Sequence, residues 1–224
     1  MEIQPLYNKV VSSNKYKTRP TQFQMVEFIN NCFMLLEDES REFLGEHIVI
    51  VEAPTGTGKS LAYILSGLIN AINLDKKFVI STATKTLQAQ LFNQDLPFIK
   101  QKSGIQFNYG LAKGRSNYLC PYQLINNLST AEQDLLQQSE GTRDKLHKVL
   151  TAFESGKWNG DLDSASVPID SKLKPLCTAD KYQCIGTSCE YNQKDDCKCP
   201  YYLNREQLKK CDVIITNHSL LLAD

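Results

Sequence analysis

The sequence lacks an excess of charge of either sign. Its 224 residues include 25 Lys and Arg and 25 Asp and Glu, so the formal net charge is zero at pH 7. No general electrostatic field attracts a nucleic acid, and any such binding must come from a local groove. With 42% hydrophobic residues, the chain can bury the core of one large domain or of a domain with an insertion.

Long apolar runs are also missing. Residues 1–17 contain no apolar segment of signal-peptide length, and no later run approaches the ~18 apolar residues that a membrane span requires. Internal repeats and low-complexity tracts are absent from the sequence as well. We therefore expect a cytoplasmic protein that does not enter membranes.

Cysteine, in contrast, is plentiful. The chain has eight cysteines, and five of them lie between Cys177 and Cys199. Disulfides rarely persist in a reducing compartment, so this clustering indicates metal ligands more than cross-links.

Apolar spacing predicts an α/β organisation. It indicates helices over 19–36, 59–73 and 86–96, and strands over 48–51, 78–82 and 212–216. Strand, glycine loop, helix and strand in succession form a βαβ unit, which implies a parallel sheet. Residues 120–200 show no convincing strand but two helices, over 131–139 and 142–155, and then a stretch rich in Gly, Asp and Cys. We interpret this region as an insertion into the sheet domain.

A glycine-rich loop lies between the first predicted strand and its helix. Successive backbone N–H groups of such a turn form a cradle for phosphate. Lys59 would reach the β- and γ-phosphates of a nucleotide, and the Ser60 hydroxyl would bind the Mg²⁺ that bridges them. Kinases, GTPases, transporters and helicases share this loop, so it predicts nucleotide binding without identifying the reaction. The loop reads Ala53-Pro54-Thr55-Gly56-Thr57-Gly58-Lys59-Ser60, with alanine at the first glycine position of the usual pattern.

This form of the loop resembles that of superfamily 2 helicases, and the flanking segments are similar to the DinG/XPD-type iron-sulfur DNA helicases. Arg19-Pro20-Thr21-Gln22 resembles the adenine-reading Q motif, in which a glutamine amide can donate to and accept from the adenine edge. Residues 81–91 resemble motif Ia, which in the family lies against single-stranded DNA. Hydroxyl and amide groups at a strand end can bind phosphates without reading sequence, although Thr82 or Thr84 could instead cap the following helix.

Two later segments also resemble the family and occur in the same order as they do there. Residues 113–121 resemble the start of the family's iron-sulfur domain, and residues 211–218 resemble the strand and the Asn217-His218 pair that follow it. The resemblance runs from about Tyr16 to the last residue, is closest to DinG, and covers only the N-terminal part of such a helicase. It implies ATP-driven 5'-to-3' movement on single-stranded DNA, or on DNA with a single-stranded tail, in DNA repair.

The resemblance also implies a 4Fe-4S cluster. Spacing alone leaves the last ligand open, because seven residues separate Cys189 from Cys197 and nine separate it from Cys199. In the family the last ligand precedes an aromatic-rich helix start, which Cys199-Pro200-Tyr201 matches. The implied ligands are Cys120, Cys184, Cys189 and Cys199, with Cys177 and Cys197 as spare thiols. Structural zinc accepts the same ligand type and stays an alternative.

Cations and aromatic rings flank these cysteines. Arg115 and Arg205 supply positive charge and Tyr201 and Tyr202 supply stacking faces, which a single-strand path would use, and Lys113 adds a further cation. A partly packed, solvated surface is the alternative reading.

One component of a hydrolytic site is not found. Hydrolysis requires an acidic residue at the end of another strand to hold Mg²⁺, and no apolar strand here ends in Asp-Glu. We therefore expect a partial RecA-like P-loop lobe with a parallel sheet (1–119 and 206–224), interrupted by a helical iron-sulfur insertion (120–205). This chain alone is expected to be inactive, since the acidic box and second lobe are absent. The alternatives are a non-catalytic nucleotide- and DNA-binding fragment and an unrelated P-loop enzyme with structural zinc.

Overall fold

The structure is a computed structural model, and it describes residues 2–12, 19–34, 48–133, 140–193 and 197–223. It divides into two compact units: unit 1 is Met1–Leu111 with Lys210–Asp224, and unit 2 is Ala112–Lys209. None of the described helices is both long and apolar enough to cross a bilayer.

Unit 1 is built on a parallel sheet. Its strands β1 (Phe78–Thr82), β2 (Tyr109–Leu111) and β3 (Val213–Asn217) lie in the order β1-β3-β2, with both neighbouring pairs parallel. The central strand β3 is the most buried of the three, and its residues Val213 and Ile215 are fully buried. The predicted α/β class and parallel sheet are confirmed, although β2 was not among the predicted strands.

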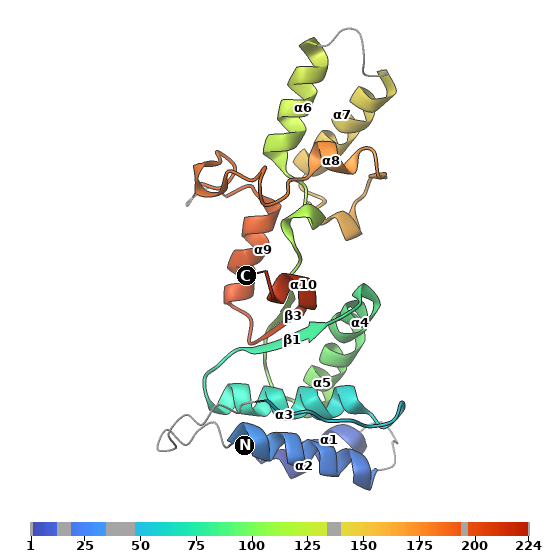
Figure 1. Cartoon of the computed structure of the whole chain (residues 1–224), viewed down its shortest axis with the longest axis vertical. Helices are drawn as coiled ribbons and strands as arrows, with labels where there is room; N and C mark the ends of the chain where they lie inside the picture. Colours follow the sequence, from blue (N-terminus) through green and yellow to red (C-terminus); the bar gives the residue numbers. More distant parts are fainter. Residues whose placement is uncertain (1, 13–18, 35–47, 134–139, 194–196, 224) are drawn as a thin grey trace. The chain divides into compact units, whose positions relative to one another are not determined.

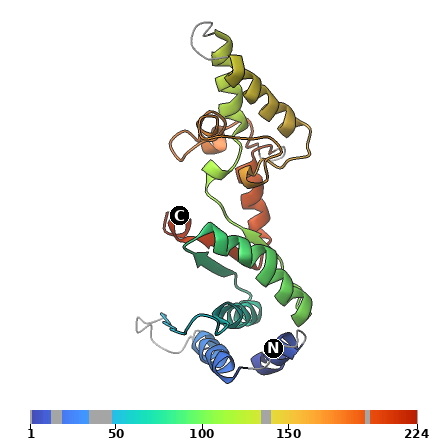
Figure 2. The same ribbon diagram turned by 90° about the vertical axis from the view of Figure 1, so that its right-hand side faces the viewer.

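Helices pack beside this sheet in unit 1 (Figures 1 and 2). They are α1 (Ile3–Ser12), α2 (Pro20–Met34), α3 (Lys59–Asn73), α4 (Lys85–Gln90), α5 (Leu96–Ser103) and α10 (His218–Leu221). Helix α3 is the most buried because its apolar residues recur at helical spacing, and it packs against α2. The predicted helices over 59–73 and, within the described residues, 19–36 are confirmed; Leu36 lies outside them.

The predicted helix over 86–96 is longer than expected and contains an irregular turn. Helix α4 continues through the π-helical turn η2 (Leu91–Asp95) into α5, and the three form one continuous path in Figure 2. Pro97, in the first turn of α5, has no N–H to donate to the turn before it. The regular series of helical backbone hydrogen bonds is therefore interrupted just before Pro97. The π-helical turn occupies this interruption.

The predicted strand over 48–51 is wrong. Residues 48–51 adopt no regular structure, and Ile48 and Ile50 are 82% and 88% exposed. A β-branched apolar run becomes a strand only when a neighbouring strand pairs with it. Here the segment and β1 instead line a cavity of about 1060 Å³.

Unit 2 consists of helices and turns, with isolated bridges as its only β-pairing in the described residues. Its helices are α6 (Pro121–Gln133), α7 (Glu140–Glu154), α8 (Lys174–Cys177) and α9 (Pro200–Lys209), and its 3-10 turns are η3 (Arg115–Asn117), η4 (Leu162–Ser164) and η5 (Gly186–Ser188). Helices α6 and α7 lie side by side over a core that includes Leu124, Leu146 and Trp158 (Figure 1). The predicted helix over 142–155 is confirmed. The one over 131–139 lies mostly outside the described residues, and α6 begins earlier, at Pro121.

Candidate functional site

The phosphate loop connects the irregular segment 48–52 to α3 and depends on two glycines. Gly56 and Gly58 have φ values of 80° and 84°, which only glycine adopts without strain. A Cβ atom on Gly58 would also lie 1.8 Å from the Gln22 amide nitrogen. Both the turn and its close contact with α2 therefore require glycine at position 58.

Lys59 is the first residue of α3, and its ammonium turns back over the loop. It donates to the carbonyl oxygens of Ala53 and, at 3.0 Å, of Pro54. The Thr57 hydroxyl donates to the same Pro54 carbonyl at 2.9 Å. These carbonyls hold the ammonium, the one cation of the loop, against the backbone of the loop.

The N-terminal end of α2 is tied to the phosphate loop. Arg19 donates to the Gly56 carbonyl, and the Gln22 amide nitrogen donates to the Gly58 carbonyl at 3.1 Å. Gln22 is buried, and its amide oxygen accepts a 3.1 Å hydrogen bond from the Tyr7 hydroxyl of α1. The structure thus brings together Arg19, Gln22 and the loop, three elements that sequence analysis assigned to one nucleotide.

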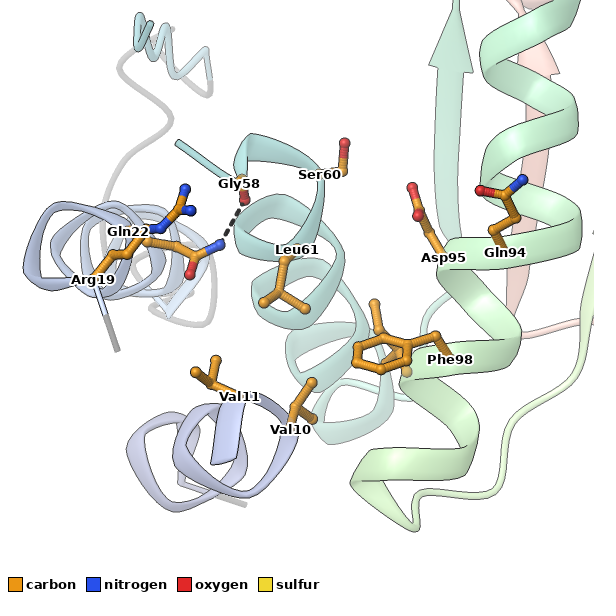
Figure 3. A pocket seen from close by; sticks show the side chains of 11 residues that line it. Val10, Val11, Arg19, Gln22, Gly58, Ser60, Leu61, Gln94, Asp95 and Phe98 are labelled. Atoms are coloured by element: carbon orange, nitrogen blue, oxygen red, sulfur yellow. Dashed lines mark hydrogen bonds between the residues drawn. The ribbon is translucent and has the colours of Figure 1, made fainter. Parts of the chain in front are cut away.

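A pocket of about 400 Å³ lies beside this joint (Figure 3). One end is polar, with Arg19, Gln22 and Gly58, and Ser60 and Asp95 lie toward the other side. Apolar side chains from α1, α3 and α5 complete the lining: Val10, Val11, Leu61, Phe98 and Ile99. A concave apolar site with a few polar groups suits the base of a nucleotide.

Sequence reasoning missed Asp95, which lies in the π-helical turn of this pocket. Burial raises the pKa of its carboxyl, and a hydrogen bond from Gln90 opposes that shift. Burial also raises the pKa of Tyr63, which is hydrogen-bonded to Ser60 and influenced by the charge of Asp95. The signal in the sequence was the Asp95-Leu96-Pro97 run, since proline within a helical pattern marks an irregular turn.

In the segment that resembles motif Ia, some residues are buried or cap a helix and others are exposed. Thr84 caps α4 by accepting from the Leu87 N–H at 3.2 Å, so the capping alternative is confirmed for Thr84. Thr82 and Gln88 are buried, and Lys85 and Thr86 are exposed. Only part of the segment can therefore face a ligand.

The ends of β1 and β3 are joined by side chains. The Ser81 hydroxyl and His218 Nδ1 lie 2.8 Å apart. Asn217 caps α10 by accepting from the Leu220 N–H at 2.7 Å. The Asn217-His218 pair thus fixes the carboxyl end of the sheet.

Two of the cysteines proposed as ligands precede helices of unit 2. The Cys120 carbonyl accepts from the Leu124 N–H at 3.0 Å and the Cys199 carbonyl accepts from the Leu203 N–H at 2.9 Å, so both occupy the N-cap position. Each is followed by proline, at Pro121 and Pro200, as suits the first residue of a helix.

The thiols of unit 2 influence one another. Burial raises the pKa of Cys120, with hydrogen bonds from backbone groups at the start of α6 opposing it and the Cys189 and Cys184 thiols adding to it. Burial likewise raises the pKa of Cys199 to about 11, against backbone hydrogen bonds at the start of α9, and Cys120 adds to that shift. Cys120 is therefore close enough to sense Cys184, Cys189 and Cys199.

The other cysteines are engaged elsewhere. Cys177 is fully buried in the core of unit 2, its thiol donates to the Leu173 carbonyl at 3.4 Å, and burial raises its pKa to about 11. The Cys197 thiol lies 3.7 Å from the Asn192 amide oxygen. Among the described residues, no three His, Cys, Asp or Glu side chains converge on a point where they could hold one metal ion.

Of the flanking cations and aromatic residues, Lys113 is not presented as a free charge. Its ammonium binds Asp161 at 2.6 Å and Asp163 at 2.8 Å, and only 13% of its side chain is exposed. Burial lowers the pKa of Lys113, but the hydrogen bonds and charges of both carboxylates outweigh burial and raise it.

The arginines and tyrosines, in contrast, form one cluster in unit 2. The guanidinium groups of Arg115 and Arg205 lie 5.2 Å and 5.9 Å from the centre of the Tyr201 ring. The Tyr202 ring packs edge-on against Tyr201, and burial raises the pKa of the Tyr202 hydroxyl, with the nearby Cys184 thiol adding to that shift. This cluster brings the stacking faces near one of the proposed ligands.

Known proteins resemble this chain along most of its length. Residues 39–150, half of the chain, match the family described as DEAD/DEAH box helicase. The ATP-dependent DNA helicase DinG of Photobacterium profundum is 40% identical over 189 residues, which cover 82% of this chain and 27% of that protein. The ATP-dependent DNA helicase DinG of Escherichia coli K12 is 32% identical over 217 residues, which cover 90% of this chain and 30% of that protein. The chain therefore spans less than a third of the length of these relatives.

Proposed function

Because this chain belongs to the DEAD/DEAH box helicase family, we propose that it forms the nucleotide-binding and cysteine-bearing part of an ATP-dependent DNA helicase. The observation that carries the proposal is the joint between α2 and the phosphate loop. There Arg19 and Gln22 bind the carbonyls of Gly56 and Gly58 beside a pocket of about 400 Å³ that ends near Ser60. A base bound in this pocket and phosphates bound over the loop would thereby be connected.

The phosphates of ATP would bind over the loop of residues 53–60. The N–H groups at the start of α3 and the ammonium of Lys59 favour negative charge there. An incoming phosphate offers Lys59 a stronger acceptor than the neutral carbonyls that it now binds. The Ser60 hydroxyl would hold Mg²⁺, which neutralises charge on the bridging phosphate oxygens.

The DNA would bind at the carboxyl end of the sheet. The exposed residues Thr84, Lys85 and Thr86 supply a hydroxyl-rich, cationic edge at the start of α4. Such groups bind phosphate without reading sequence, which suits an enzyme that moves along single-stranded DNA. By family resemblance we propose movement in the 5'-to-3' direction, on single strands or tailed duplexes.

A 4Fe-4S cluster is the proposed cofactor of residues 120–205. The donor type fits, because Cys120, Cys184, Cys189 and Cys199 would hold such a cluster through thiolates, the ligands that iron-sulfur clusters take. Cys120 lies within electrostatic reach of Cys184 and Cys189, and Cys199 within reach of Cys120, although Cys177 and Cys197 interact with the same group, so the choice of these four rests on the family resemblance. The backbone N–H groups at the starts of α6 and α9 would stabilise the thiolate forms of Cys120 and Cys199, and Cys197 has no such position. When bound, a cluster would require these thiols as thiolates and would cross-link the segments that carry them.

The proposed ATP-binding lobe comprises 1–119 and 206–224.

We further propose that these 224 residues bind ATP without hydrolysing it at a helicase-like rate. Lys59 and Ser60 favour bound phosphates, but interactions that favour substrate and transition state alike do not raise the rate. Loss of an arginine finger alone costs about 10³ to 10⁵ in rate in enzymes that use one.

A steady-state phosphate-release assay with and without single-stranded DNA tests this proposal, with the DinG helicase of Escherichia coli as a positive control. We expect no DNA-stimulated turnover by the 224-residue chain. Turnover comparable to that of the control would show that a residue of this chain completes the site.

Substitution of the loop lysine tests the nucleotide assignment. We expect Lys59→Ala to weaken equilibrium binding of ATP by about 10- to 100-fold, because a charge-assisted contact to phosphate is lost. Lys76→Ala, an exposed lysine beyond the other end of α3, is the matched control and should leave ATP affinity unchanged. Equal affinity in the wild type and Lys59→Ala would contradict the assignment.

A further inference from the structure

His218 lies at the carboxyl end of the sheet, close to the edge that is proposed to bind DNA. The parallel register pairs Thr82 of β1 with Asn217 of β3, so His218 lies one residue beyond this pair and Ala83 lies one residue beyond it on the neighbouring strand. Asn217 caps α10 by accepting from the Leu220 N–H at 2.7 Å, which fixes the backbone at position 218. His218 is an exposed residue, so a ligand at the start of α4 can reach it.

One nitrogen of the His218 ring is engaged by the protein and the other is not. Nδ1 lies 2.8 Å from the hydroxyl oxygen of Ser81. Among the residues that the structure describes, Nε2 has no hydrogen-bond partner. The two nitrogens of an imidazole are distinct and point in different directions. The contact with Ser81 therefore holds the ring and leaves Nε2 for a group from outside the protein.

A hydroxyl partner at Nδ1 is compatible with a hydrogen-bond donor at Nε2. When the Ser81 hydroxyl donates to Nδ1, the neutral ring carries its hydrogen on Nε2. When the hydroxyl accepts from Nδ1–H of a protonated ring, Nε2 carries a hydrogen as well. Only the neutral tautomer with its hydrogen on Nδ1 makes Nε2 an acceptor, and an anionic ligand selects against that tautomer. A carbonyl partner, in contrast, would hold the hydrogen of a neutral ring on Nδ1.

We propose that His218 is a further phosphate-binding residue of the DNA edge and that Ser81 is its positioning residue. The proposal rests on the proposed binding of single-stranded DNA at the carboxyl end of the sheet, and it extends that edge from α4 to α10. A phosphate oxygen accepts from Nε2–H whatever base follows, so the contact should not depend on DNA sequence. The phosphates of a nucleotide have the same chemistry, and Ser81 and Lys59 line one cavity of about 1060 Å³, so the test has one arm for each source.

Equilibrium binding of a fluorescently labelled single-stranded oligonucleotide to the 224-residue chain tests the DNA arm. We expect His218→Asn to weaken binding by about two- to tenfold, the range of one hydrogen bond, on thymine-rich and adenine-rich strands alike. Asparagine places an amide atom where Nδ1 lies, so it can keep the contact with Ser81 while Nε2 is lost. His147→Asn changes an exposed histidine of α7 in unit 2, and as the matched control it should bind DNA like the wild type.

A second substitution of the same residue separates a phosphate contact from a structural role of the ring. Glutamine places its amide nitrogen near the position of Nε2, so His218→Gln should bind DNA more tightly than His218→Asn. If both variants lose the same affinity, the effect belongs to the structure around the ring and the inference is overturned. Wild-type DNA affinity in His218→Asn overturns it as well.

Substitutions of Ser81 test its positioning role. Ser81→Ala should weaken DNA binding less than His218→Asn does, and Ser81→Thr, which keeps a hydroxyl, should restore the affinity. In the His218→Asn background, Ser81→Ala should cause no further loss, because no Nε2 remains to be oriented. The same loss from Ser81→Ala in both backgrounds would show that Ser81 acts independently of His218 and would overturn its positioning role.

ATP binding distinguishes the two sources of phosphate, and Lys85→Ala distinguishes this inference from the proposed function. His218→Asn should bind ATP like the wild type, and weakened ATP binding would place the ring at the nucleotide and overturn the assignment to DNA. If Lys85→Ala weakens DNA binding and His218→Asn does not, the edge stands and only the inference falls. If neither variant changes DNA binding, or if the wild type binds no DNA, the proposed edge is wrong and the inference falls with it.

Discussion

The phosphate loop of unit 1 and the cysteine-bearing segments of unit 2 both offer groups for a ligand, but they are built in different ways. The loop is made of consecutive residues whose backbone forms the cradle, with Gly56 and Gly58 in the left-handed region. The four proposed cluster ligands come from segments up to 79 residues apart, from Cys120 to Cys199, and each contributes a side chain. A backbone site is formed once the local turn is made, whereas a side-chain site depends on every segment being in place.

The two lysines of these regions show the same difference. Lys59 binds neutral carbonyls of its own loop, which a phosphate can replace. Lys113 binds two carboxylates, Asp161 and Asp163, and its charge is already neutralised. The first lysine is available for a ligand, and the second holds two segments of unit 2 together.

The largest expected effect concerns the side-chain site. We expect Cys120→Ser, Cys184→Ser, Cys189→Ser and Cys199→Ser each to abolish iron binding, because a cubane that lacks one thiolate loses one iron ligand. The measurement is iron and acid-labile sulfide in protein purified without oxygen, and the two should be present in comparable amounts in the wild type.

Two substitutions serve as matched controls for this test. Cys177→Ser and Cys197→Ser should keep the iron, since the Cys177 thiol lies in the core and Cys197 does not cap a helix. Loss of iron in Cys197→Ser with retention in Cys199→Ser would reverse the fourth assignment. Stoichiometric zinc in place of iron would rule out the cluster.

A smaller effect, on the free energy of unfolding, is expected to distinguish Lys113 from Lys59. We expect Lys113→Met to lower the free energy of unfolding by about 1 to 3 kcal/mol, because it leaves two carboxylates close together without their cation. The measurement is urea unfolding of both variants, and Lys59→Met should unfold like the wild type. Lys113→Met should in turn retain wild-type ATP affinity. If Lys113→Met lost ATP binding without losing stability, the assignment of Lys113 to structure and Lys59 to ligand binding would be contradicted.

The pH dependence of the Lys113 contribution follows from the direction of its pKa shift. The folded-state pKa of Lys113 is raised, so its stabilisation is fully present below the unfolded-state pKa of about 10.4. It is lost as the pH rises through the higher folded-state value. The difference in stability between wild type and Lys113→Met should therefore be constant near neutral pH and shrink only in strongly alkaline solution.

The smallest expected effect concerns Asp95, an acid of unit 1 whose carboxyl accepts a hydrogen bond from the Gln90 amide at 3.3 Å. Burial raises its folded-state pKa, so the carboxylate opposes folding once the pH exceeds the unfolded-state value of about 3.9. We expect Asp95→Asn to raise the melting temperature slightly at pH 7 and less at pH 3.5, where both states hold the proton. Glu52→Gln, on the exposed side of the loop, is the control. An equal gain at both pH values would assign the effect to packing instead of charge.

How much of the site was predictable differs between these regions. Residues 53–60 form a glycine turn that leads into α3 as predicted, because glycine dihedrals and helical spacing are local properties. Residues 48–51 have an equally clear apolar pattern, yet they form no strand, because a strand needs a paired neighbour. Lys113 was interpreted as a cation for a single-strand path or as part of a packed surface, and nothing in its neighbouring sequence revealed Asp161, 48 residues away.

The sequence by itself determined the phosphate loop, the helix that follows it, the parallel α/β class and the family, because these depend on residue type and short-range spacing. Only the tertiary structure decided that Tyr7 reaches Gln22, that Asp95 lines the pocket of about 400 Å³ beside the glycine loop and that Lys113 is paired. Each of these three features depends on how separate elements of the chain pack together. The strength of such interactions depends on distance and burial, which spacing along the chain does not specify.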